Sequence, residues 1–218
     1  MSNFKKLKQR HRELRDNFSQ SLTLRVHRSL SWLGRAESED EGSDDDVTFV
    51  LLWIAFNSAY AEEIDYNSTE RECFKKFFSI IVEMDKAQSI YNLVWTRFPK
   101  EIRLLLDNQY VYAAFWRNVN GDETCANWRE RMSKDKDRIN TALKHRDTAQ
   151  ILSILFERLY VLRNQLVHGG ATWKSSVNRA QVKDGKALLS NLMPIFIDIL
   201  MDNTEYDWKM PFYTVIEA

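Results

Sequence analysis

The chain has 218 residues, and its hydrophobic content of 44% is sufficient for one sizeable core. Its 31 lysines and arginines balance 31 aspartates and glutamates, which excludes a generally basic protein that binds any polyanion. Only six glycines and three prolines occur, so the composition favours long regular elements over a fold rich in turns. We therefore expect one domain spanning residues 1–218.

Cysteine usage and hydropathy indicate the compartment. Cys73 and Cys125 are far apart and form no C-x-x-C motif, which fits a reducing environment. The basic residues 1–6 are followed by no apolar segment, so no signal peptide is predicted. The longest apolar run, residues 49–56, is too short to cross a bilayer. We expect a soluble, cytoplasmic protein without membrane contact.

The first third of the chain alternates basic, apolar and acidic segments. Residues 1–18 form a basic N-terminal arm, which is either a frayed, solvated helix or an arm that contacts RNA. Residues 19–36 have the spacing of a firmer helix. Residues 37–46 are almost entirely acidic or small, and because like charges repel one another we predict a loop there. Its last aspartate is placed to cap the next helix.

Residues 47–63 are apolar on nearly every face, which is typical of the central helix of a bundle. A buried strand is the alternative, but the alanines and glutamates that end the segment favour a helix. Asn57 lies within this apolar stretch. Because a buried amide needs hydrogen-bond partners, Asn57 either bonds a neighbouring helix or faces a ligand site.

The middle of the chain predicts several shorter helices. Residues 69–85 are amphipathic and begin with a Thr-x-x-Glu capping signal. Residues 86–97 continue the helical pattern, and Pro99 begins another short helix. Residues 107–121 are aromatic and are expected to pack in the core. Residues 123–146 form a charged helix that ends in a basic Lys-His-Arg cluster.

The most informative stretch begins at Thr148. Leucines recur at three- and four-residue steps up to Leu166, which predicts a helix facing a core, and the pair Gly169–Gly170 predicts its end. A last helix follows from residue 178 to residue 200, and residues 203–218 form an irregular tail. The sequence therefore predicts an all-α bundle of about six to eight helices.

The polar cluster Arg163, Asn164 and His168 occupies the last turns of the Thr148 helix and suits one reaction. When RNA is cleaved by its own 2′-hydroxyl, a histidine can move the protons, and a guanidinium can stabilise the phosphorane. The alternative is that Arg163 pairs with a carboxylate and that His168 merely lies at a favourable helix C-terminus. The four histidines do not pair at ligand spacing, and no glycine-rich phosphate loop is present, so neither a metal nor a cofactor is predicted.

The stretch Leu162-Arg-Asn-Gln-Leu-Val-His-Gly-Gly170, together with the Trp53-Ile-Ala-Phe-Asn57 helix, resembles the HEPN superfamily, and most closely its Apea-like subgroup. The resemblance implies an HEPN-like core and a metal-independent endoribonuclease of a toxin–antitoxin, anti-phage or RNA-processing system. It also implies a homodimer in which two motif helices build one composite site, and a cognate antitoxin or regulatory protein as a further partner. Other HEPN proteins are non-catalytic modules that bind a nucleotide or a partner protein, which is the alternative function.

The resemblance assigns roles to the motif residues. His168 is expected to act as general base or acid, Arg163 to stabilise the transition state and Asn164 to orient them. Asn57 is a weaker candidate for substrate binding. Three basic residues are expected to hold RNA phosphates: Lys144, Arg146 and Lys174.

Overall fold

The computed structural model describes residues 2–40, 44–61, 69–211 and 213. These described residues form helices joined by turns and contain no strand, so the predicted all-α class is confirmed. They include ten α-helices, slightly more than the predicted six to eight. The difference arises because the helical pattern after residue 86 is divided into several short helices and because the N-terminal arm is itself a helix.

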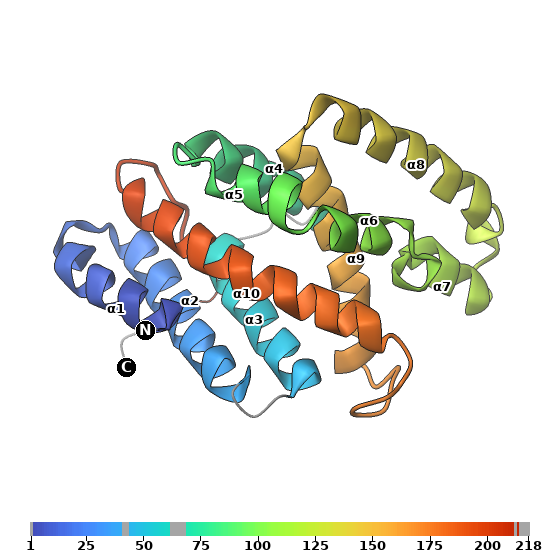
Figure 1. The fold of residues 1–218 in the computed structure, drawn as a ribbon, viewed down its shortest axis with the longest axis horizontal. Coiled ribbons are helices and arrows are strands. Elements are labelled where there is room, and N and C mark those ends of the chain that lie inside the picture. Colours follow the sequence, from blue (N-terminus) through green and yellow to red (C-terminus); the bar gives the residue numbers. More distant parts are fainter. Residues whose placement is uncertain (1, 41–43, 62–68, 212, 214–218) are drawn as a thin grey trace.

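The first three helices and the last helix of the chain pack together in one half of the molecule (Figure 1). α2 (Gln20–Asp40) and α3 (Asp45–Tyr60) form the most extensive contact, and α10 (Arg179–Asp202) packs on both of them. α1 (Asn3–Leu14) packs against α2 and α10. The predicted helix over residues 47–63 is therefore α3, and the alternative of a strand is wrong.

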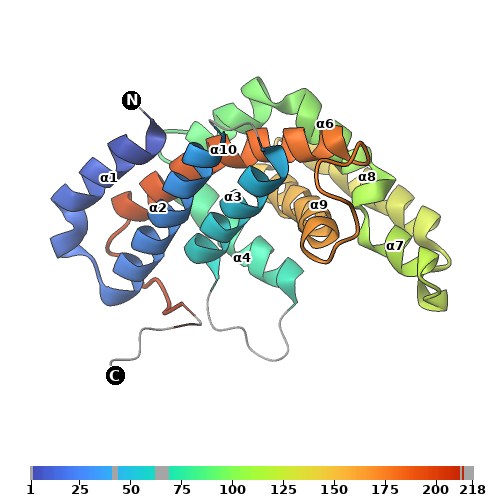
Figure 2. The same ribbon diagram turned by 90° about the horizontal axis from the view of Figure 1, so that it is seen from below.

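The other half is organised around α9 (Thr148–Val167), which carries the polar motif. α9 packs against α3 and α4 (Glu70–Met84) on one side, and against α6 (Pro99–Asp107) and α8 (Trp128–His145) on the other. Two short helices complete this half: α5 (Ser89–Asn92) and α7 (Ala113–Val119). Figure 2 shows α1 at one end of the molecule and α7 and α8 at the other.

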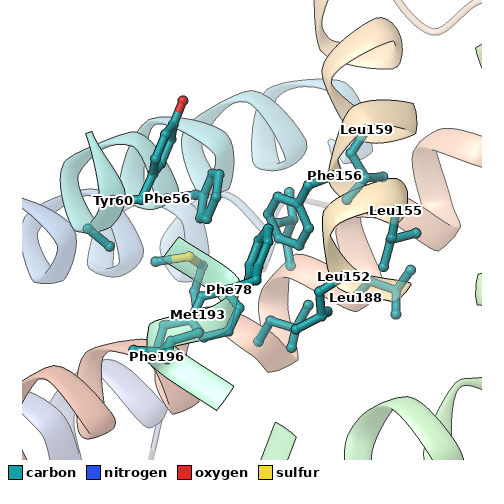
Figure 3. Packing of buried hydrophobic residues seen from close by; sticks show 14 of the residues in the cluster. Phe56, Tyr60, Phe78, Leu152, Leu155, Phe156, Leu159, Leu188, Met193 and Phe196 are labelled. Carbon is teal, nitrogen blue, oxygen red and sulfur yellow. The ribbon is translucent and has the colours of Figure 1, made fainter. Parts of the chain in front are cut away.

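Aromatic side chains fill the core where α3, α4, α9 and α10 meet. Phe156 of α9 packs against Phe56 of α3 and Phe78 of α4, with ring centroids at 4.4 and 4.7 Å (Figure 3). Gly185 lets α10 approach this core closely, because a Cβ atom there would lie 2.8 Å from the Phe49 ring. The core thus packs the middle of α9 against α3, α4 and α10.

The predicted acidic loop over residues 37–46 is largely wrong. α2 continues through Asp40 and α3 begins at Asp45; residues 41–43 lie outside the described part of the chain. The acidic side chains that the structure describes do not simply repel one another, because they have basic or N–H partners. Glu39 pairs with Arg35 at 2.7 Å, and Glu37 accepts the Phe4 backbone N–H at the start of α1 at 3.1 Å.

The basic N-terminal segment is a packed helix. Arg10 of α1 forms ion pairs with Asp198 and Asp202 of α10, and Leu7 and His11 are buried. This contradicts the frayed helix, whereas contact of this segment with RNA stays a prediction. At the other end, residues 203–211 contain no helix, as predicted, whereas the rest of the predicted tail, apart from Tyr213, lies outside the described residues. No described helix is long and apolar enough to span a membrane.

His11 gives the stability of the fold a predictable dependence on pH. It is 3% exposed, and neither ring nitrogen bonds another described residue. Burial, and then the positive charges of Lys8, His27 and Arg15, lower its pKa below the ordinary value. The unfolded chain therefore binds this proton more readily, so stability should fall as pH is lowered through about 6.5, the pKa of an unperturbed histidine.

We expect thermal unfolding of wild-type protein between pH 7.5 and 5.5 to show this loss. The variant His11→Leu should lose less stability over the same window, because it has no proton to take up. If the stability of the two proteins fell equally with pH, His11 would not be the cause of the loss.

Candidate active site

The C-terminal end of α9 is closed by a local backbone motif that fixes the position of His168. The N–H of Gly170 donates to the carbonyl of Gln165 at 2.7 Å, and the N–H of Gly169 donates to that of Leu166 at 3.4 Å. Gly169 has a φ of +70°, a conformation that favours glycine. This pair of bonds is the Schellman arrangement. It makes His168 the last residue before the chain leaves the helix, as the glycine pair predicted.

Arg163 and Asn164 form a contact of their own one turn earlier. Arg163 Nη1 donates to Asn164 Oδ1 at 2.8 Å, and both side chains are half-buried. Among the described residues Arg163 has no carboxylate partner, so the alternative in which it forms a structural ion pair is not observed there. The remaining N–H groups of its guanidinium are free to bind an anion.

His168 is exposed at the end of the helix. Its backbone N–H donates to Asn164 O at 3.0 Å, and its imidazole bonds no other described side chain. The ring is therefore accessible to a ligand while its backbone is held. Arg163 and His168 lie five positions apart, about 140° around an ideal helix, so within one chain the two side chains diverge.

Gln165, which was not among the predicted site residues, connects this end of α9 to two other segments by hydrogen bonds. Its amide Nε2 donates to Tyr110 O at 2.7 Å, and its Oε1 accepts from Asn178 Nδ2 at 2.5 Å. Gln165 thus connects the motif helix to the turn after α6 and to the start of α10. Its position inside the Arg-Asn-Gln sequence was the signal that could have identified it.

The loop after the motif is anchored to the N-terminus of α3 by aspartates. Asp44 caps α3 through the Val47 N–H at 3.1 Å and accepts the Trp173 indole N–H at 2.7 Å. Although burial opposes the shift, these hydrogen bonds lower the pKa of Asp44. Asp46 accepts the Lys174 backbone N–H at 2.7 Å and pairs with Arg179 at 2.9 Å, and this contact raises the pKa of Arg179. A cap from this acidic segment was predicted, but from its last aspartate, Asp46, rather than from Asp44. The contacts of the segment with the motif loop were not predicted.

Removing the Asp46 carboxylate should loosen this loop. In Asp46→Ala we expect the free energy of unfolding to fall by about 1–3 kcal/mol, because Arg179 and the Lys174 N–H lose a buried acceptor. At roughly 2–4 °C per kcal/mol for a chain of this size, the melting temperature should fall by several degrees. Hydrogen exchange of residues 172–179 should accelerate. Asp16→Ala, at a side chain that is 91% exposed, is the control and should melt like wild type. If Asp46→Ala had the melting temperature and the hydrogen exchange of wild type, the anchoring role of Asp46 would be contradicted.

The structure separates the predicted auxiliary residues. Lys174 lies in the loop that directly follows the motif, with Nζ 4.6 Å from the centre of the Trp173 ring. Lys144 and Arg146 precede the start of α9, about 22 Å along the helix from Arg163. Asn57 is half-buried one turn from the far end of α3, about 16 Å along the axis from Asp46.

Of these four residues, Lys174 is the one that lies next to the motif in the chain. The Asn57 side chain bonds no described neighbour, so its predicted bond to an adjacent helix is not observed there. Arg146 instead donates to the Tyr91 hydroxyl at 2.7 Å. No group of three or more histidine, cysteine or carboxylate side chains within the described ranges is placed to hold a metal ion.

Comparisons of this chain with models of protein families, with curated proteins and with solved structures find no match. What the site does is therefore inferred from its own residues and their surroundings.

Proposed function

We propose that the protein is a metal-independent endoribonuclease whose active site is built from Arg163, Asn164 and His168. The observation that carries the proposal is that one end of α9 holds both a half-buried guanidinium, which has no carboxylate partner among the described residues, and an exposed imidazole. An arginine without a partner ion is suited to bind phosphate, and a histidine near a phosphate can transfer protons at neutral pH. The resemblance of the motif to HEPN nucleases points to the same chemistry.

The reaction needs only groups that the chain and the RNA supply. One imidazole accepts the proton of the ribose 2′-hydroxyl as its oxygen attacks the adjacent phosphorus. The bond to the 5′-oxygen breaks, and that oxygen takes a proton from the same imidazole, which the first transfer has protonated. Arg163 stabilises the extra negative charge of the phosphorane, and Asn164 holds the guanidinium in place. The products are a 2′,3′-cyclic phosphate end and a 5′-hydroxyl end.

A second copy of the chain would complete this site. Arg163 and His168 point away from each other on one helix, so a two-fold pairing of α9 ends could set Arg163 of one chain beside the imidazole of the other. Two exposed apolar side chains are close to the motif in the chain, Val167 at 48% and Trp173 at 68% exposure. Such side chains commonly mark an interface. The proposal includes a cytoplasmic toxin or anti-phage role, with an antitoxin or regulator as the partner that restrains cleavage.

The test is cleavage of a mixed pool of single-stranded RNA by the purified protein in excess EDTA. We expect fragments that carry 2′,3′-cyclic phosphate ends, because the 2′-oxygen is the nucleophile. Single-stranded RNA is chosen because its flexibility lets that oxygen align with the scissile bond. Uncut RNA with a folded, dimeric protein, or fragments that carry 3′-hydroxyl ends, would refute the proposal.

The same exposed apolar side chains favour a second candidate, a non-catalytic module that binds a nucleotide or a partner protein. In that case Arg163 and His168 would hold a ligand phosphate or stabilise the interface. Overexpression separates the two candidates. A nuclease should be toxic and lose its toxicity in His168→Ala, whereas a binding module should be harmless in both forms.

A further inference from the structure

A second polar site lies on a different part of α9. A cavity of about 410 Å³ opens between the start of α4, α7, α8 and the middle of α9. Two carboxylates line it, Asp135 and Glu157, against five cationic side chains, so its formal charge is clearly positive. The five cationic residues are Arg71, Arg117, Arg131, Lys134 and Arg158.

Arg158 is the unusual member of this cavity. It is 2% exposed, and neither Nε nor Nη2 makes a hydrogen bond to a described residue. The nearest carboxylate oxygen, on Asp135, is 3.9 Å from Nη2, which is beyond hydrogen-bond distance. The guanidinium lies against the ring of Tyr112, 4.4 Å from its centre. Burial lowers the pKa of Arg158, but an arginine stays charged at neutral pH, so its buried N–H groups need an acceptor.

Neither carboxylate is free to supply that acceptor. Glu157 is engaged by Arg71 at 2.7 Å, and burial raises its pKa, which weakens its negative charge. Asp135 pairs with Arg138 at 3.3 Å and accepts the Tyr112 hydroxyl. Burial, and then the charge of Asp135, raise the pKa of Tyr112 to about 12, so the phenol stays protonated and keeps donating.

The other cations of the cavity differ in how they are engaged. Arg117 pairs with Asp122 at 2.7 Å, and Arg131 donates to Thr124 O at 2.7 Å. Lys134 makes no ion pair with any residue in the described part of the chain. Three of the five cations therefore have an ion-pair or hydrogen-bond partner. Arg158, deep in the cavity, has unbonded Nε and Nη2 atoms, and Lys134, at its exposed α8 wall, has no ion-pair partner among the described residues.

We propose that this cavity, the Arg158 cavity, binds a phosphoryl group through Arg158 and Lys134. A doubly charged group with several acceptor oxygens satisfies the unbonded N–H groups of a guanidinium and neutralises the excess charge better than a single carboxylate does. Arg158 is about 7.5 Å along α9 from Arg163 and faces another direction. The Arg158 cavity is thus separate from the proposed nuclease site, and it gives a role to α7 and α8.

A phosphoryl group can come from inorganic phosphate, from a free nucleotide or from an RNA backbone. Calorimetric titration of the full chain at low salt, with each probe in turn, distinguishes these sources. The probes are inorganic phosphate, adenosine 5′-monophosphate and a short single-stranded RNA with a 5′-hydroxyl end. The RNA titration uses the His168→Ala background, so that cleavage, or its absence, does not affect the result.

We expect at least one probe to bind and Arg158→Met to weaken it on the order of 10- to 100-fold. Lys134→Gln should weaken it by a smaller factor. Lys136→Gln is the control, because it removes the same charge from a residue of α8 that pairs with Asp107 outside the cavity. Binding of the small probes assigns a free phosphate or nucleotide, and binding of RNA alone assigns the backbone.

A melting experiment provides a second readout. Without ligand, Arg158→Met should melt at the wild-type temperature or above it, because a buried charge without a good partner is replaced by an apolar side chain. Bound phosphate should raise the melting temperature of wild type and leave that of Arg158→Met unchanged. If Arg158→Met fails to fold, probe binding by the exposed Lys134→Gln variant still tests whether the Arg158 cavity binds a phosphoryl group. The proposal is overturned if no probe binds wild type at millimolar concentration, or if both variants bind as wild type does.

Discussion

Replacing His168 with alanine is expected to lower the rate of RNA cleavage in EDTA by about 10²- to 10⁴-fold, the usual contribution of a general acid or base. The imidazole is exposed and bonds no other described side chain, so its removal should leave the fold intact. The melting temperature should therefore match that of wild type. The rate should be measured with saturating protein over one turnover, so that product release does not hide the chemical step.

His145→Ala is the matched control for this prediction. His145 is also an exposed histidine in the last turn of a helix, but it lies at the end of α8, remote from the motif. The His145→Ala protein should cleave RNA at the wild-type rate. Comparable activity in wild type and His168→Ala would remove the histidine from the mechanism, and loss of activity in both variants would point to a general effect of charge.

Arg163→Ala is expected to lower the rate of RNA cleavage by about 10²- to 10³-fold, because the variant lacks the guanidinium that stabilises the phosphorane. Mixing the inactive Arg163→Ala and His168→Ala proteins then tests the composite site. If one chain supplies Arg163 and the other His168, a mixed dimer keeps one of its two Arg163–His168 pairs intact. Random exchange of an equal mixture makes about half of the dimers mixed, so about a quarter of the wild-type activity should return. Mixtures that stay inactive although they exchange subunits would place both residues of each site in one chain.

Replacing Phe156 with alanine should have the largest effect on stability. The ring is fully buried and contacts aromatic rings from three helices: Phe56 of α3, Phe78 of α4 and Phe196 of α10, at 4.4, 4.7 and 6.3 Å. Loss of such a side chain costs about 3–5 kcal/mol, since the rigid surroundings leave a cavity. This is a large part of the roughly 5–15 kcal/mol that stabilises a typical domain.

Urea denaturation followed by circular dichroism measures this loss as a lower midpoint at an unchanged slope. Leu104→Ala is the control, because Leu104 is 56% exposed and its truncation should change stability by less than about 0.5 kcal/mol. A Phe156→Ala protein as stable as the control would mean that the four helices do not meet as described. Because Phe156 also fixes α9, cleavage by Phe156→Ala should decline at temperatures where the wild type is still active.

Features that depend on neighbours in sequence were predictable. Thr148 begins α9 as expected, and the capping box of α4 forms between Thr69 and Glu72. Gly169 and Gly170 end the motif helix, because only glycine readily takes the positive φ at that position. Local backbone preferences and apolar periodicity were sufficient in these cases. They also placed Arg163, Asn164 and His168 together at one helix end.

Features that depend on distant partners were not predictable. The acidic segment was expected to be a loop because its own charges repel one another, but Asp46 finds Arg179 at a separation of 133 residues. Asn57 looked like a site residue within its own helix, and only the packing of α3 places it away from the end of α9. No local pattern specifies such pairings.

The sequence by itself determined the helical class, the boundaries of α9 and the chemistry available at its end, because these follow from interactions within a few turns of one chain. Only the tertiary structure decided which charges are neutralised and which are not. Arg163 and Arg158 lie on the same helix, five residues apart. Packing leaves Arg163 half-buried beside Asn164, whereas it buries Arg158 without a hydrogen-bonding carboxylate among the described residues. That difference depends on where α4, α7 and α8 place their side chains around α9.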